Sequence, residues 1–307
     1  MPDSISPLAV SWVAALVATG CAMFGAWRVR GSTAVPAALW ATLAGAALAG
    51  EMAWRAAGAL HDPPAVAAVR LVAAALSLCP IISLLGAKRP QHGVWQLIVA
   101  TLAVVLALPA ATATLVRPGT FPDVPLLARG FMLLLVAVGW LNFIGTRRGL
   151  AATLVVAGQI ILLRSFLPLG VPVSPAAAGL DAIGCLLVAA GGVLAAAMSA
   201  WPPRPAAAGH PLAARIDPPW LALRETLGAA WTLRIAERFD AIAASRGWPC
   251  RLRFRGLDPG AEAAAGAWEA AAERVFRSLM RRFVSQSWMQ RHHEAHARLI
   301  GPADGRV

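Results

Sequence analysis

Long apolar stretches follow one another along the first two thirds of the chain, separated by short polar segments. They cover roughly residues 8–27, 34–55, 65–86, 94–116, 126–145, 149–169 and 179–201. A helix needs about 20 mostly apolar residues to cross the hydrocarbon core of a bilayer. The pattern predicts an all-α polytopic membrane protein, with about seven transmembrane helices in residues 1–202. A tight turn joins 126–145 to 149–169, so a hairpin that does not cross fully remains the alternative there.

Composition supports two regions in two solvents. Hydrophobic residues make up 58% of the 307 positions and charged residues only 14%, whereas a soluble domain carries about 25% charged residues. The long apolar runs precede Pro202, and most of the charge follows it. A cleaved lipoprotein signal ending at Cys21 is a weaker alternative for the N-terminus, because no basic residue precedes Arg28. We therefore expect the first apolar stretch to be retained as a helix.

Basic residues alternate with the apolar stretches. Pairs follow the first, third and fifth stretches, and a basic tail follows the seventh: Arg28 and Arg30, Lys88 and Arg89, Arg147 and Arg148. Because cytoplasmic connections are enriched in Lys and Arg, this alternation places the N-terminus outside and the C-terminus in the cytoplasm. Abundant Ala and Arg with a single Lys are typical of a GC-rich bacterial genome. The expected location is the bacterial cytoplasmic (inner) membrane.

The remaining sequence predicts a small soluble C-terminal domain, α+β or mostly helical. Residues 203–218 are interpreted as a Pro-rich linker, and 219–307 as a cytoplasmic basic helix–strand–helix domain. Apolar positions at helical spacing predict one helix from Pro219 to Gly247, a second over 259–282 and a short third over 285–299. Strict alternation over 250–255 predicts a single strand. Such a strand pairs with another chain, packs on the helices, or is not a strand.

Six ionisable residues fall within or beside the apolar stretches, in the outer third of the predicted membrane domain. They are Glu51, Arg55, Arg70, Arg129, Arg164 and Asp181. Ionised groups at such depth usually face the bundle interior or a wet cavity, and four cations against two acids favour an anionic or lipid-like ligand. The alternative is structural: arginines near helix ends extend to the interface, and the acids pair with them. Gln159 is expected to form an interhelical hydrogen bond.

The tail carries a second group of candidates. Past Pro202 there are sixteen Arg against ten Asp and Glu, a net charge of +6. A strand face and a helix stripe contribute Arg251, Arg253, Arg255, Arg277, Arg281 and Arg282. These residues are candidates for contact with anionic lipid or with a protein partner, and a solvated basic face is the alternative. Nucleic acid is disfavoured because no recognisable binding motif accompanies the charge.

Two patterns resemble metal sites without completing one. Cys79-Pro80 lacks the nucleotide-binding motifs of a metal-pumping ATPase, and Pro80 is explained by a helix kink. The run from His292 to His296 is one residue short of the His-Glu-x-x-His zinc motif, and we interpret it as a solvated helix face. The predicted spans contain no histidine for haem and no lysine for a retinal Schiff base. No metal and no cofactor is expected.

No catalytic motif is recognisable, so the sequence favours a non-enzymatic membrane component. In this hypothesis the bundle anchors a cytoplasmic tail that binds a protein partner or a second copy of the chain. The alternative is a transporter or membrane-embedded enzyme that binds an anionic or lipid-like ligand at the outer arginine-rich cluster. Against it, the sequence contains no convincing inverted repeat or paired broken helices.

Overall fold

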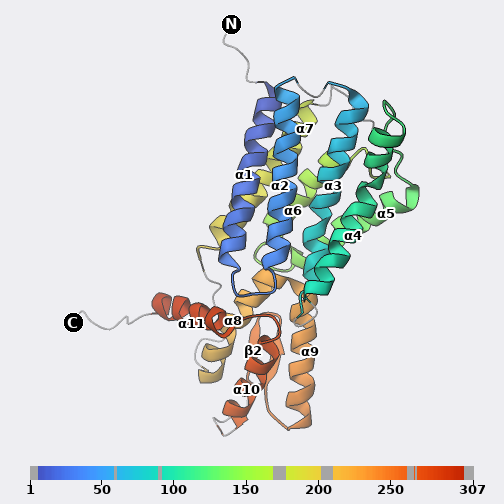
Figure 1. Cartoon of the computed structure of the whole chain (residues 1–307). Coiled ribbons are helices and arrows are strands. Elements are labelled where there is room, and N and C mark those ends of the chain that lie inside the picture. The colour runs from blue at the N-terminus through green and yellow to red at the C-terminus, as the bar shows by residue number, and fades with distance from the viewer. Residues whose placement is uncertain are drawn as a thin grey trace, which may run out of the picture.

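The structure is a computed structural model that describes residues 6–58, 61–88, 92–168, 178–201, 210–260, 266 and 268–300, excluding the side chains of 92 and 296–300. Its elements are α1 (Pro7–Arg28), α2 (Val35–Ala56), α3 (Pro63–Leu85), α4 (His92–Ala111), the π-helix η1 (Thr112–Val116), α5 (Leu126–Ile144), α6 (Gly149–Leu163), α7 (Ala178–Met198), α8 (Pro211–Leu227), α9 (Ala229–Ser245), β1 (Arg251–Arg253), β2 (Gly256–Asp258), α10 (Trp268–Met280) and α11 (Gln286–Ile300). Helices α1–α7 form a bundle, and the later elements form a tail domain against one end of it (Figure 1). We call that end the tail-side end and the opposite end the free end.

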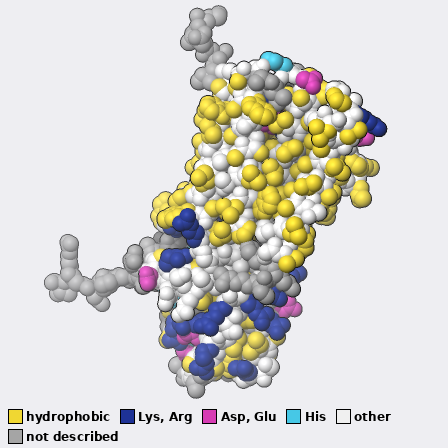
Figure 2. All heavy atoms as spheres, viewed as in Figure 1, with side chains coloured by type: hydrophobic (Ala, Val, Ile, Leu, Met, Phe, Trp, Pro, Cys, Tyr) yellow, Lys and Arg dark blue, Asp and Glu magenta, His cyan; other side chains and the backbone are white. Residues whose placement is uncertain are grey.

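Helix α3 lies at the centre of the bundle, where it packs against α2, α4, α5 and α6. Its most apolar window is 67% buried, against 17% for α1. The surrounding helices expose large apolar side chains such as Leu97, Val104 and Leu127, and apolar groups cover the visible face of the bundle (Figure 2). Among the described residues, α1–α5 and α7 are long and apolar enough to cross a membrane, with α4 continuing through η1. The fold is therefore compatible with a helical membrane protein.

Within the described ranges, six of the seven predicted spans are long and apolar enough to cross a membrane, and α6 is the shorter exception. It still runs between the two ends of the bundle, because Arg147 before it binds Glu225 of the tail and Arg164 at its C-cap binds Asp181 at the opposite end. This helix has 15 residues, from Gly149 to Leu163, and is about 22 Å long at 1.5 Å per residue. It corresponds to the stretch 149–169, for which the alternative from the sequence is a hairpin with 126–145 that does not cross fully. A buried turn continues from it, because Phe166 and Leu167 are 3% and 0% exposed. The sequence pattern could not separate this turn from the helix, since both are equally apolar.

Small residues bring α6 and α7 into close contact. A methyl group added at Gly158 would lie 2.5 Å from the main-chain oxygen of Gly184, and one at Gly191 would lie 2.7 Å from that of Ala151. The face of α7 that carries Gly184 and Gly191 therefore packs inside the bundle, because only a hydrogen side chain permits this approach. Gln159 on α6 donates to the Ser77 hydroxyl at 3.0 Å, which confirms the predicted interhelical bond.

The tail begins differently from the prediction. Helix α8 starts at Pro211, inside the predicted linker 203–218, and residues 203–209 of that linker lie outside the described residues. The single predicted helix from Pro219 to Gly247 is instead two helices, α8 and α9, which meet at Gly228. Gly228 has φ 78° and ψ −167°, a conformation that is essentially restricted to glycine. Apolar spacing continues across the break, so the periodicity alone hides it.

The predicted strand pairs within the chain. β1 and β2 form an antiparallel hairpin in which Arg251, Leu252 and Arg253 oppose Asp258, Leu257 and Gly256. Leu252 and Leu257 are buried and the arginines are exposed, which confirms the alternation over β1. A second chain is not needed to complete this sheet. Helix α10 starts at Trp268 rather than at the predicted 259, with 261–265 and 267 outside the described residues.

The tail domain is bonded to the tail-side end of the bundle at three places. In the connection after α1, Thr33 N donates to Phe283 O at 2.8 Å and Gly31 O accepts from Ser285 N at 2.7 Å. In the last turn of α3, Leu84 O accepts from the Trp231 indole at 2.7 Å.

In the last turn of α5, the Asn142 side chain bonds both sides of the Gly228 break. It donates to Leu227 O at 3.0 Å and accepts from Ala230 N at 2.9 Å. Buried bundle residues also join the apolar core of the tail: Ala34, Ala37, Leu84 and Ala87. The bundle and the tail are therefore packed through a shared core.

Candidate functional site

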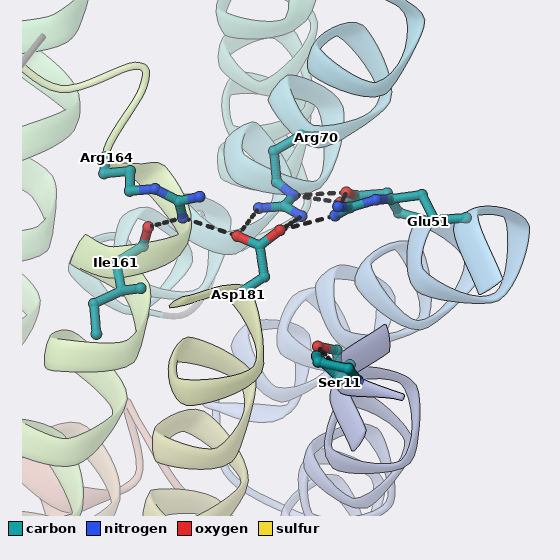
Figure 3. Close-up of polar contacts among 8 residues, drawn as sticks. Ser11, Glu51, Arg70, Ile161, Arg164 and Asp181 are labelled. Atoms are coloured by element: carbon teal, nitrogen blue, oxygen red, sulfur yellow. Dashed lines mark hydrogen bonds and ion pairs between the residues drawn. The ribbon is translucent and has the colours of Figure 1, made fainter. Parts of the chain in front are cut away.

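Five of the six ionisable residues predicted in the apolar region meet at the free end of the bundle. We call Glu51, Arg55, Arg70, Arg164 and Asp181 the charge cluster; their side chains are at most 10% exposed. They come from α2, α3, the C-cap of α6 and the first turn of α7. In Figure 3 Asp181 lies between Arg164 on one side and Arg70 with Glu51 on the other. The cluster therefore joins four helices.

Asp181 is the hub of the cluster. Its carboxylate accepts from Arg55 at 2.8 Å, from Arg70 at 3.1 and 3.2 Å, and from Arg164 at 2.8 Å. Arg70 also binds Glu51 through its Nε, at 2.6 and 2.8 Å. Charge-assisted bonds of this length are the strong class of hydrogen bond. Both carboxylates are thus shared among guanidinium groups in apolar surroundings.

The cluster has a net positive charge of one, because three guanidinium groups face two carboxylates. Arg164 carries the least compensated of these cations. Its Nη1 is bonded to Asp181 and, at 2.7 Å, to Ile161 O, but its Nε is buried without a hydrogen-bond partner. A buried donor without a partner is costly. Arg164 is therefore the member of the cluster with spare capacity for an anion.

Arg129 does not belong to the cluster. It lies in the first turn of α5, and its Nε donates to Val124 O at 2.8 Å, five residues back in the chain. The prediction that placed it with the others was wrong, because depth along the chain does not say which way a helix faces. Ser11 on α1 is fully buried nearby but bonds its own helix, at Pro7 O (Figure 3).

The six predicted tail arginines are all exposed, but they do not gather into a single site. Arg251, Arg253 and Arg255 belong to the hairpin, whereas Arg277, Arg281 and Arg282 belong to α10 and the turn after it. Lys and Arg side chains dominate the visible face of the tail, with a few acids between them (Figure 2). The basic strand face and the basic helix stripe that the sequence predicts are therefore both exposed, as two separate groups.

A hollow of about 110 Å³ lies between α8, α10 and α11, and we call it the tail groove. Its apolar lining includes Pro219, Phe276 and Met289, and its basic lining includes Arg215, Arg277 and Arg281. One carboxylate, Glu273, also lines it and binds both Arg215 at 2.9 Å and Arg277. Arg215 and the groove itself were missed from the sequence, because the residues come from three separate helices.

The histidine run is not a metal site in the part of the chain that the structure describes. His292 is half-buried, stacks on Trp288 with ring centroids 3.9 Å apart, and bonds Trp288 O through Nδ1. Burial lowers its pKa below the usual value. The interpretation of this run as a fully solvated face was therefore wrong for His292, which packs against its own helix.

Asp217 is a buried acid that the sequence did not single out. Its Oδ1 accepts from Leu257 N at 2.7 Å, while Oδ2 is buried without a partner. Burial raises the pKa of this carboxyl from 3.8 to about 6. Gly256 permits the approach, because a methyl group there would lie 2.8 Å from Oδ2. The role supported by these contacts is to hold the hairpin against α8.

Comparison of the chain with protein-family models, with curated proteins and with solved structures finds no match. The features that bear on function are therefore the charge cluster, the docked tail and the basic surface of the tail.

Proposed function

We propose that the chain is a multi-pass protein of the bacterial cytoplasmic membrane that holds a partner-binding domain against the inner face. The bundle is the anchor, the N-terminus lies outside, and the tail lies in the cytoplasm. No enzymatic activity is assigned. The observation that carries the proposal is that the tail is bonded to the connection after α1 and to the ends of α3 and α5, and shares a buried core with the bundle.

The orientation is supported by charge. The end of α1 and the connections after α1, α3 and α5, at the tail-side end, carry the cations Arg28, Arg30, Lys88, Arg147 and Arg148. Connections rich in Lys and Arg usually remain in the cytoplasm, which supports a cytoplasmic tail-side end. Reporters fused to the two termini test this: opposite compartments are expected, and a shared compartment would overturn the topology.

The charge cluster supports an anchoring role for the bundle. Each of its carboxylate groups is engaged by at least two guanidinium groups, and the bonds connect α2, α3, α6 and α7. Ion pairs satisfied in this way fix the relative positions of helices that apolar packing alone would let slide. A rigid bundle suits a protein that presents a domain at a constant height above the membrane.

The tail groove is the surface that we assign to the partner, a protein segment with acidic side chains. An apolar floor with a basic rim fits a short segment that combines apolar and carboxylate side chains. Glu273 compensates part of this charge, but Arg281 also lines the groove, and no ion pair of Arg281 is found among the described residues. Binding through such a surface should weaken as salt is raised, because the rim is exposed.

The test is charge reversal of the full-length protein in its native membrane. Arg277→Glu with Arg281→Glu should remove a partner that co-purifies with the wild-type protein. Arg234→Glu with Arg238→Glu on α9 makes the same charge change at exposed positions outside the groove, and should keep it. Equal retention of the partner by both variants would contradict the assignment to the groove.

Deletion of residues 204–307 is a less selective test than point changes in the groove. The tail covers Ala34, Ala37, Leu84 and Ala87, so its removal also uncovers an apolar part of the bundle. Loss of function after truncation would therefore report either a lost partner or a damaged anchor. Point changes in the groove separate the two.

A second candidate function is ligand binding at the charge cluster, by a transporter or by an enzyme that acts on an anionic or lipid-like substrate. It is favoured by the net positive charge and by the buried, unpartnered Nε of Arg164. Arg164→Ala should then reduce ligand-induced stabilisation far more than it reduces the stability of the free protein. Equal losses of the two would leave only the structural role.

A further inference from the structure

Arginines from several segments converge at the tail-side end of α1 and α7. The Arg28 guanidinium donates to Ser199 O at 2.5 Å, and that of Arg148 donates to the Ser199 hydroxyl at 2.7 Å. Arg147, in the same connection as Arg148, donates to Trp201 O at 3.2 Å. Residues of α1, of the α5–α6 connection and of the end of α7 thus meet at one edge of the bundle.

Helix α11 adds a further guanidinium. Arg291 donates to Arg30 O at 2.7 Å, which fixes α11 against the end of α1. In Figure 1, α11 runs crosswise to the bundle helices at this level and leads away from the bundle. We call Arg28, Arg30, Arg147, Arg148 and Arg291 the arginine corner; all but the half-buried Arg148 are exposed.

The corner is short of negative charge. None of its arginines forms an ion pair with an acidic side chain among the described residues. Glu225 lies beside it: its Oε1 accepts from Arg147 N at 3.4 Å and from Arg224 at 2.7 Å, and its charge offsets part of that of Arg148. Each guanidinium has five N–H donors, so the single carbonyl and hydroxyl bonds leave most donors free.

Aromatic side chains border the corner on the bundle side. Trp27 and Trp201 are 54% and 65% exposed, and Phe24 packs against Trp27 with ring centroids 5.9 Å apart. Exposed tryptophans beside an apolar surface are typical of the headgroup level of a bilayer. With the proposed topology, the corner therefore lies at the headgroups of the cytoplasmic leaflet, with the acyl chains beside α1 and α7.

We propose that the arginine corner binds the phosphate headgroup of an anionic phospholipid in the cytoplasmic leaflet. Phosphate oxygens supply the negative acceptors that the corner lacks, and the exposed cations attract them at the membrane surface. Basic surfaces between transmembrane helices on the cytoplasmic side are known to select anionic lipids. The inference depends on the membrane topology but not on the acidic partner at the tail groove.

The test measures lipid binding to the full-length protein in detergent micelles. Phosphatidylglycerol and phosphatidylcholine are titrated separately, and bound lipid is counted by native mass spectrometry. Each cation near a membrane surface contributes an attraction that corresponds to about a five-fold change in affinity. Arg28→Gln with Arg30→Gln should therefore weaken phosphatidylglycerol binding roughly 25-fold and leave phosphatidylcholine binding unchanged.

Two further variants make the result decisive. Arg28→Lys with Arg30→Lys keeps the charge and should retain most of the binding. Arg234→Gln with Arg238→Gln removes two exposed cations from α9 and should bind as the wild type does. The proposal is overturned if the glutamine pair binds phosphatidylglycerol normally, if the lysine pair loses as much as the glutamine pair, or if the α9 control loses it equally.

Discussion

Removal of the hub of the charge cluster should destabilise the bundle strongly. Asp181→Asn keeps the size of the side chain but raises the net charge of the cluster from +1 to +2. Glu51, which binds Arg55 and Arg70, is then the one carboxylate of the cluster, and Arg164 loses its acidic partner. The loss of one partner from a buried ion pair costs about 3–5 kcal/mol. Asparagine still accepts a hydrogen bond, so we expect a loss near the lower limit, about 3 kcal/mol in the free energy of unfolding.

The assay is reversible unfolding of the full-length protein in micelles, followed by tryptophan fluorescence. Asp123→Asn is the matched control, because Asp123 is exposed and outside the cluster. It should change stability by less than about 0.5 kcal/mol.

Arg164→Gln in the Asp181→Asn background restores the net charge of +1, so the two losses should couple by about 1–3 kcal/mol. A loss below about 1 kcal/mol for Asp181→Asn, together with simple additivity, would refute the idea that the cluster holds the four helices together.

Three further changes test the tail. Gly228→Ala should cost about 1–3 kcal/mol, because φ is 78° and the added methyl group meets the Asn142 side chain; thermal unfolding measures it. Asp217→Asn should abolish the contribution of this carboxyl to the pH dependence of stability. Because its pKa is raised from 3.8 to about 6, that contribution is largest below pH 3.8 and falls by about 3 kcal/mol as pH rises from 3.8 through 6. Denaturant unfolding at pH 4 and 7.5 checks it, and a wild-type protein no less stable at pH 7.5 would contradict it. Trp231→Phe should cost about 1 kcal/mol in the same assay, because its indole bond to the end of α3 is lost.

The charge cluster was largely predictable from sequence. Ionised residues in apolar stretches must find partners, and the predicted depths brought Glu51, Arg55, Arg70, Arg164 and Asp181 to one level. The depth of a residue in the predicted membrane domain does not show which way its side chain faces. The Arg129 guanidinium has the same depth but satisfies itself locally, at Val124 O. Arg129 was therefore misplaced, because hydropathy does not show the direction in which its side chain points.

The tail was predicted less completely, because its folding depends on contacts with the bundle. The alternation of β1 was recognised, but β2 has three residues, from Gly256 to Asp258, and too little pattern to be seen. The break between α8 and α9 at Gly228 is bonded on both sides by Asn142, 86 positions earlier in the chain. Bonds from Phe283 and Ser285 to the first connection use main-chain atoms, which every residue carries, so no side-chain pattern marks them.

The bond between Thr33 and Phe283 has a consequence for how the protein is made. These two residues are 250 positions apart. The connection after α1 therefore cannot form this bond until almost all of the chain has been synthesised. Domains generally fold in the order of synthesis, yet here the earliest segment is finished by one of the latest. A prematurely terminated chain would leave Ala34 and Ala37 uncovered, and incompletely folded chains of this kind are removed by proteases.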